Sequence, residues 1–122
     1  MSQTILVVDD DPSIVHLLKE DLEIEGYDVL TGFDGQSAVE VAQSKAPQLI
    51  IMDLNMPSFS GLQALEALRS KPETQNIPVI FLSGQDSRSQ PIPQDPAGRT
   101  ARLTKPVELI ELNNLVKSLL AA

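Results

Sequence analysis

Residues 5–12 read ILVVDDDP, so four apolar side chains are followed directly by three aspartates and a proline. The same change from apolar to polar occurs where LIIM, 49–52, meets Asp53 and where VIFL, 79–82, meets Ser83. Continuous apolar runs of this length are typical of strands that are buried on both faces of a parallel sheet. We therefore predict three central strands, each of which ends at a polar residue.

The segments around these strands complete an alternating pattern. The first helix is expected to begin at Pro12, with Asp11 as its N-cap, and to stop at Gly26. Other helices are predicted at about 35–45, 61–70 and 107–120, and weaker strands at 27–31 and 100–104. The inward-facing residues of the last helix are expected to be Ile110, Leu112, Leu115, Val116 and Leu119. The alternation predicts a single α/β domain over 1–122, with helices on both faces of a parallel sheet.

One segment interrupts this alternation. Residues 85–99 contain Pro91, Pro93 and Pro96. Proline removes a backbone donor and clashes with the preceding helical turn, which argues against a regular helix. The fourth helix of the pattern is therefore expected to be short, irregular or absent.

Composition limits the kinds of partner. A net charge of -8 and a pI of about 4.4 disfavour direct contact with nucleic acid, whose binding depends on Lys and Arg. The absence of cysteine is compatible with a reducing compartment. No apolar run approaches the roughly 20 residues of a membrane span, and the N-terminus lacks the basic start of a signal peptide. We expect a cytoplasmic protein that contacts neither nucleic acid nor membrane directly.

Polar side chains gather where the predicted strands end. Asp9 and Asp10 end the first strand, Asp53 the third and Ser83 the fourth, and Lys105 follows the fifth. Open parallel α/β sheets bind their ligands at the carboxyl ends of the strands. Carboxylates held close together repel one another unless a cation lies among them, and Mg²⁺ favours such hard oxygen ligands. An aspartate can also attack phosphorus, while an ammonium and a hydroxyl stabilise the phosphoryl oxygens.

Four strings in this order and spacing resemble the response-regulator receiver family over essentially the whole chain. They are VVDDDP (7–12), DLNMPSFSG (53–61), FLSG (81–84) and LTKP (103–106). The resemblance implies a three-layer α/β/α sandwich of the flavodoxin-like type, with five parallel strands in the order 2-1-3-4-5. It also implies two-component phosphorelay signalling, with a sensor histidine kinase or a histidine phosphotransfer protein as phosphodonor and an output partner that remains unknown.

The resemblance further implies a role for each site residue. Asp53 would be the phosphoacceptor, and Ser83 and Lys105 would contact the phosphoryl group. Mg²⁺ would be held by Asp10 directly, by Asp9 largely through water, by Asp53 and by the backbone carbonyl of Asn55. The Lys105–Pro106 peptide would be cis. Asn55 and Gln85 would tune the lifetime of the phosphoryl group.

The chain departs from the family at the switch position. Most receivers carry an aromatic residue three positions before the lysine, where this chain has Arg102. A long cation cannot be buried in an apolar pocket without a partner charge, so the usual relay from Ser83 to the surface is in doubt. Gly84 replaces the common alanine and opens access to the site. We therefore expect phosphorylation with an unconventional output face.

Two other functions remain open. A pseudo-receiver would bind partners without phosphorylation; the intact site residues argue against it, and Arg102 and the prolines leave it possible. A phosphatase of the haloacid dehalogenase type also uses an aspartyl nucleophile and Mg²⁺. That family carries a second aspartate two positions after its nucleophile and needs a cap over its substrate. The leading interpretation is a phosphoacceptor with slow self-dephosphorylation rather than an enzyme, either free-standing or part of a longer protein.

Several residues have simpler interpretations. Asp11 is better explained as an N-cap than as a metal ligand. His16 is better explained as a surface residue than as a phosphohistidine, and Lys105 alone could be a surface lysine. Phe33 and Phe59 lie in predicted loops, where they either cap the core or offer a contact surface.

Overall fold

The computed structural model describes residues 3–57, 59–84, 91–93 and 99–121. The strands are β1 (Thr4–Val8), β2 (Asp28–Gly32), β3 (Leu49–Asp53), β4 (Val79–Ser83) and β5 (Thr100–Thr104). They form one parallel sheet in the order β2-β1-β3-β4-β5, which confirms the predicted order. Residues of β3 and β4 are all buried, whereas the edge strands β2 and β5 are largely half-buried.

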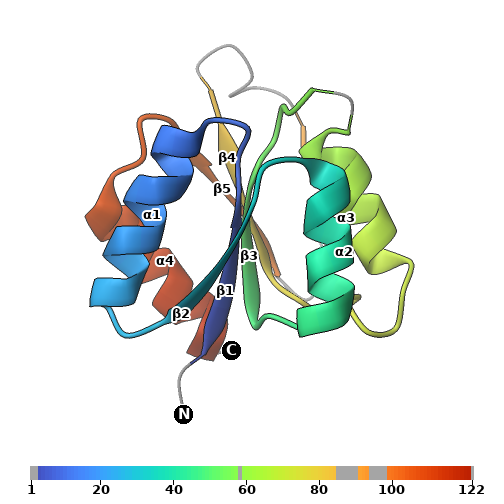
Figure 1. Ribbon diagram of the computed structural model, residues 1–122, viewed down its shortest axis with the longest axis horizontal. Coiled ribbons are helices and arrows are strands. Elements are labelled where there is room, and N and C mark those ends of the chain that lie inside the picture. Colours follow the sequence, from blue (N-terminus) through green and yellow to red (C-terminus); the bar gives the residue numbers. More distant parts are fainter. Residues whose placement is uncertain (1–2, 58, 85–90, 94–98, 122) are drawn as a thin grey trace.

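Four helices are present among the described residues, and they cover the sheet in two layers. Helices α1 (Pro12–Ile24) and α4 (Leu109–Ala121) pack on one face, and α2 (Gly35–Lys45) and α3 (Gly61–Arg69) on the other (Figure 1). The predicted three-layer sandwich is therefore confirmed. Residues 85–90 and 94–98 lie outside the described residues, so the expectation about a fourth helix between β4 and β5 stays a prediction.

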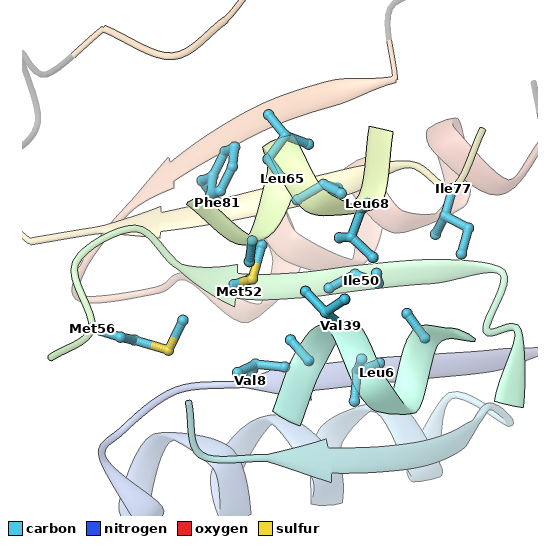
Figure 2. Packing of buried hydrophobic residues seen from close by; sticks show 14 of the residues in the cluster. Leu6, Val8, Val39, Ile50, Met52, Met56, Leu65, Leu68, Ile77 and Phe81 are labelled. Carbon is cyan, nitrogen blue, oxygen red and sulfur yellow. The ribbon is translucent and has the colours of Figure 1, made fainter. Parts of the chain in front are cut away.

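Side chains of the central strands alternate between two cores. Leu6 and Val8 of β1 face α2 and α3 together with Phe81 of β4 (Figure 2), while Ile5 and Val7 face α1 and α4. A strand places successive side chains on opposite faces, so a continuous apolar run fills both cores at once. Each fully buried aliphatic or aromatic side chain stabilises the fold by roughly 1.5–3 kcal/mol. These cores fix the strand ends on which the polar residues stand.

The helix ends follow local chemistry. Asp11 caps α1, because its carboxylate accepts a hydrogen bond from the Ser13 N–H at 2.9 Å, and Pro12 is the first helical residue. Ser60 and Gln63 form a reciprocal capping box at the start of α3.

None of the described helices is long and apolar enough to cross a membrane.

The last helix differs from its prediction in two ways. It begins at Leu109 rather than near Val107, and Ile110 is 79% exposed instead of facing inward. The buried stripe of α4 runs through Leu112 and Val116. Ile110 lies two residues before Leu112, which places it roughly 200° away around the helix, on the outer side.

Candidate functional site

The candidate site lies at the carboxyl edge of the sheet, above the neighbouring strands β1 and β3. Asp9 follows β1 directly, and Asp53 is the last residue of β3. Ser83 is the last residue of β4, and Lys105 follows β5. Because β1 pairs with both β2 and β3, the chain direction across the sheet reverses at this point, which is where open α/β sheets bind ligands. The structure thus brings together residues that are far apart in the sequence.

Three carboxylates form the centre of the site. Asp9, Asp10 and Asp53 each offer an oxygen, and these oxygens all lie within 4.8 Å of one another. Asp9 is fully buried and Asp53 is 5% exposed, whereas Asp10 is exposed to solvent. The cluster therefore has two inner carboxylates and one at its mouth.

Lys105 supplies a cation to the two inner carboxylates. Its Nζ lies 2.9 Å from Asp9 Oδ2 and 3.5 Å from Asp53 Oδ1, and its side chain is 22% exposed. The Lys105 N–H donates to the Ser83 carbonyl at 2.8 Å, which continues the pairing of β4 with β5. The Lys105–Pro106 peptide is cis, as the family resemblance implied.

Burial and like charge shift the ionisation of the site. The pKa of Asp53 is raised from 3.8 to about 6; burial is the main cause and the charge of Asp9 adds to it, while Lys105 opposes both. Burial also raises the pKa of Asp9, although the hydrogen bond from the Asp11 N–H and the contact with Lys105 partly lower it. Burial alone would lower the pKa of Lys105, but its contacts with Asp9 and Asp53 outweigh this effect and raise it. At neutral pH Asp53 is mainly ionised, which is the form that acts as a nucleophile.

Backbone N–H groups orient the two inner carboxylates. The Asp11 N–H donates to Asp9 Oδ1 at 2.9 Å, so both oxygens of Asp9 are engaged, one by Asp11 and one by Lys105. The Asn55 N–H lies 3.4 Å from Asp53 Oδ1. Leu54, between them, donates its N–H to the Leu82 carbonyl at 2.8 Å, which fixes the chain directly after Asp53.

The donor set fits Mg²⁺. Carboxylate and carbonyl oxygens are the ligands that this ion favours, and the repulsion among the three aspartates is relieved by a divalent charge. Ser83 Oγ is buried and has no hydrogen-bond partner among the described residues. A buried hydroxyl without a partner costs stability, so it indicates a group that binds beside it.

A family model for the response regulator receiver domain matches residues 5–117, most of the chain. The chain belongs to the response regulator receiver domain family. Among curated proteins, this receiver domain is 36% identical over 120 residues to the alkaline phosphatase synthesis transcriptional regulatory protein PhoP of Bacillus subtilis, with 98% of the chain and 49% of PhoP covered. It is 37% identical over 119 residues to the response regulator PleD of Caulobacter vibrioides, with 98% of the chain and 26% of PleD covered. The chain thus spans half or less of the length of these relatives.

Two solved structures extend the comparison. The receiver domain of the Francisella response regulator 1452 superposes with a TM-score of 0.84 at 33% identity, covering 98% of both chains. The receiver domain of the sensor histidine kinase PA1611 of Pseudomonas aeruginosa PAO1 gives a TM-score of 0.86 at 25% identity, covering 100% of both chains. That domain holds a magnesium ion in its active site cleft. Receiver domains of two-component systems are phosphoacceptors, and the acidic cluster of this receiver domain is compatible with Mg²⁺.

The remaining predicted residues lie where the sequence placed them. Asn55 is exposed beside Asp53, and Arg102 is half-buried on β5 in register with Phe81 of β4. His16 lies on the surface of α1, 3.4 Å from Glu20. Gln85 lies outside the described residues.

Sequence reasoning did not identify two contacts at the site. The first is the pairing of Lys105 with Asp9, which is closer than its pairing with Asp53. The second is the contact of Phe59 with Gly35, which brings the loop after Asp53 against α2. The spacing of the four motifs carried no signal for either contact.

Proposed function

We propose that this receiver domain, in the cytoplasm, accepts a phosphoryl group on Asp53 from the phosphohistidine of a sensor histidine kinase or a histidine phosphotransfer protein. The observation that carries the proposal is the Asp53 carboxylate itself. It is nearly buried, mainly ionised at neutral pH, and 3.5 Å from the Lys105 ammonium. A buried nucleophile beside a fixed cation is suited to phosphoryl transfer, which depends on positioning and on neutralising the phosphoryl oxygens.

The transfer needs little covalent chemistry from the protein. A carboxylate oxygen of Asp53 forms a bond to phosphorus while the P–N bond of the phosphohistidine breaks, and the histidine nitrogen keeps the electron pair. Lys105 would neutralise one phosphoryl oxygen, and Ser83 Oγ, which has no partner in the described part of the chain, would donate a hydrogen bond to another. Both groups already lie at the ends of their strands, so the site is organised before the donor arrives.

The metal-binding part of the proposal rests on the burial of the carboxylates. Asp10 is exposed and would bind Mg²⁺ directly, while Asp9, with both oxygens engaged inside the protein, would act largely through water. Asp53 and the Asn55 carbonyl would complete the protein ligands. When bound, the ion neutralises negative charge on the carboxylates and on the transferred group.

The product is an acyl phosphate, so the same site would return to its starting state slowly by hydrolysis. Water attacks phosphorus, the P–O bond to Asp53 breaks, and inorganic phosphate leaves with the carboxylate restored. This reaction resets the signal rather than turning over an external substrate. Arg102, in place of the usual aromatic residue, supports an output face that differs from that of most receivers.

The test is intact-mass analysis after incubation with Mg²⁺ and acetyl phosphate, with Asp53→Ala as the control. We expect one phosphoryl adduct that requires Mg²⁺ and is missing in Asp53→Ala. A wild-type chain that forms no adduct, with this donor or with phosphorylated histidine kinases, would refute phosphoacceptance and favour a pseudo-receiver. The proposal of an altered output face is tested separately, because amide exchange that shows a protected helix across 88–98 would overturn it.

A further inference from the structure

Helix α2 begins against the loop that follows the phosphoacceptor. A Cβ atom added to Gly35, the first residue of α2, would lie 2.4 Å from the Phe59 carbonyl oxygen and 2.6 Å from Phe59 Cδ1. Both distances are far below ordinary van der Waals contact, and the nearer atom belongs to the backbone. Residue 35 must therefore be glycine, because a side chain there would clash with Phe59.

The neighbouring Gly32 makes a useful contrast. It is the last residue of β2 and is buried like Gly35. A Cβ atom there would meet its nearest neighbour, a methyl group of Val8, at 3.6 Å, which is ordinary contact. The tight approach is thus a property of Gly35 and not of every buried glycine in this part of the fold.

The loop between β3 and α3 is anchored at both of its ends. Leu54 donates its N–H to the Leu82 carbonyl at 2.8 Å, and the Gly61 N–H donates to the Leu54 carbonyl at 3.0 Å. Asn55, which carries the proposed carbonyl ligand, stands near the start of this loop, and Phe59 stands near its end. The contact of Phe59 with Gly35 adds a lateral support from a different part of the chain.

Helix α2 is the firmer of the two partners. Its Ala38 and Ala42 are fully buried, and Val39 is buried in the same core. The loop buries Leu54 and Met56 in this core too, but it faces solvent at Asn55 and Pro57, and Phe59 is only half-buried. A side chain at position 35 would therefore displace the loop more easily than the helix.

We propose that Gly35 is a positioning residue of the phosphoacceptor site: it lets α2 support the loop at Phe59 and so holds the Asn55 carbonyl beside Asp53. This inference rests on the proposed function for its catalytic consequence. It assigns Gly35 no contact with Mg²⁺ or with the phosphoryl group. A loop displaced by even about 1 Å misplaces one ligand relative to the nucleophile, and errors of that size can cost up to ~100-fold in rate.

The experiment compares Gly35→Ala with Gly32→Ala in the whole chain. We measure the Kd of Mg²⁺ by calorimetry, the phosphorylation rate with acetyl phosphate at saturating Mg²⁺, and backbone amide shifts of the metal-free protein. We expect Gly35→Ala to shift the amides of 54–57 and 59–61, to raise the Kd and to lower the rate, the last two by roughly tenfold. Gly32→Ala should keep the loop shifts, the Kd and the rate of the wild type.

Phe59→Ala covers the case in which Gly35→Ala does not fold. Phe59 is only partly buried, at the margin of the core, so its truncation removes the ring from Gly35 and leaves the fully buried core side chains in place. It should also weaken Mg²⁺ binding in a folded protein. Unchanged loop shifts and an unchanged Kd in a folded Gly35→Ala, or in Phe59→Ala where Gly35→Ala is unfolded, would overturn the positioning role, even if the melting temperature falls.

The two proposals fail in different ways. If the wild type forms no adduct, phosphoacceptance fails, while the amide shifts still decide whether Gly35 positions the loop. If the wild type is phosphorylated and Gly35→Ala matches it in shifts, Kd and rate, only the positioning role fails.

Discussion

Lys105 Nζ lies closer to Asp9 Oδ2, at 2.9 Å, than to Asp53 Oδ1, at 3.5 Å. The cation proposed to stabilise the phosphoryl group thus also compensates a buried carboxylate on the metal side of the site. Among the described residues, Lys105 is the positive charge that lies within 4.0 Å of both inner aspartates. Its removal should therefore affect stability as well as chemistry.

Lys105→Met tests this double role. Without the ammonium, two buried carboxylates face each other, so we expect the free energy of unfolding in EDTA to fall by roughly 1–3 kcal/mol. Mg²⁺ should restore part of the loss, and phosphorylation should be slower at every Mg²⁺ concentration. Urea unfolding with EDTA and with Mg²⁺ measures the first effect. Lys117→Met is the control, because it removes the surface ion pair in which Lys117 Nζ lies 3.7 Å from Glu25 Oε1. This variant should change the free energy of unfolding by less than about 1 kcal/mol.

Asp53→Asn tests how strongly burial and charge repulsion at Asp53 destabilise the fold when EDTA removes metal ions. The pKa of Asp53 rises from 3.8 to about 6 on folding, so the folded protein binds this proton more tightly than the unfolded chain does. The resulting stability is present at low pH and is lost as the pH rises from about 3.8 to about 6. Near neutral pH and in EDTA, we expect Asp53→Asn to stabilise the fold by roughly 1–3 kcal/mol.

The pH dependence identifies the cause of that effect. The advantage of Asp53→Asn should shrink toward zero as the pH falls below about 4, where the wild-type carboxyl is protonated. Asp28→Asn, at an exposed side chain at the start of β2, is the matched control and should show no such gain. An equal gain at both ends of the pH range would contradict the electrostatic explanation. Urea titrations at several pH values provide the measurement.

Ser83→Ala separates stability from function. Ser83 Oγ is buried without a hydrogen-bond partner among the described residues, so its removal should leave stability unchanged or raise it by up to about 1 kcal/mol. Phosphorylation by acetyl phosphate should nevertheless slow, because one donor to the phosphoryl oxygens is lost. Ser83→Thr keeps the hydroxyl and should keep the activity. A large loss of stability in Ser83→Ala would show that the hydroxyl has a structural role instead.

The place of the site could be predicted from the sequence because its residues stand at strand ends. The apolar runs before Asp9, Asp53 and Ser83 marked buried parallel strands, and parallel strands in one sheet share a carboxyl edge. Local signals also sufficed for the cap at Asp11, since capping depends on a side chain and on N–H groups two or three residues away.

Contacts between distant segments could not be predicted in the same way. Whether Lys105 Nζ lies closer to Asp9 or to Asp53 depends on side-chain rotamers. How closely Gly35 approaches Phe59 depends on how α2 packs against the sheet. The outward position of Ile110 has a related cause. Periodicity alone does not identify which apolar residues of α4 are exposed, because they occur around most of the helix. The apolar residues of α4 are Leu109, Ile110, Leu112, Leu115, Val116, Leu119, Leu120 and Ala121.

Asp11 offers a test of whether the third aspartate of the run belongs to the metal site or only to the helix. Its carboxylate accepts from the Ser13 N–H at 2.9 Å, while its own N–H donates to Asp9 Oδ1 at 2.9 Å. Asp11→Ala removes the cap but keeps the backbone N–H. We therefore expect a loss of about 1 kcal/mol in the free energy of unfolding, with Mg²⁺ affinity and phosphorylation unchanged. Asp11→Ser keeps a capping oxygen without a negative charge and should recover the stability. Urea unfolding and calorimetric titration with Mg²⁺ check both variants, and a marked loss of Mg²⁺ affinity in both would mean that the Asp11 carboxylate binds the ion.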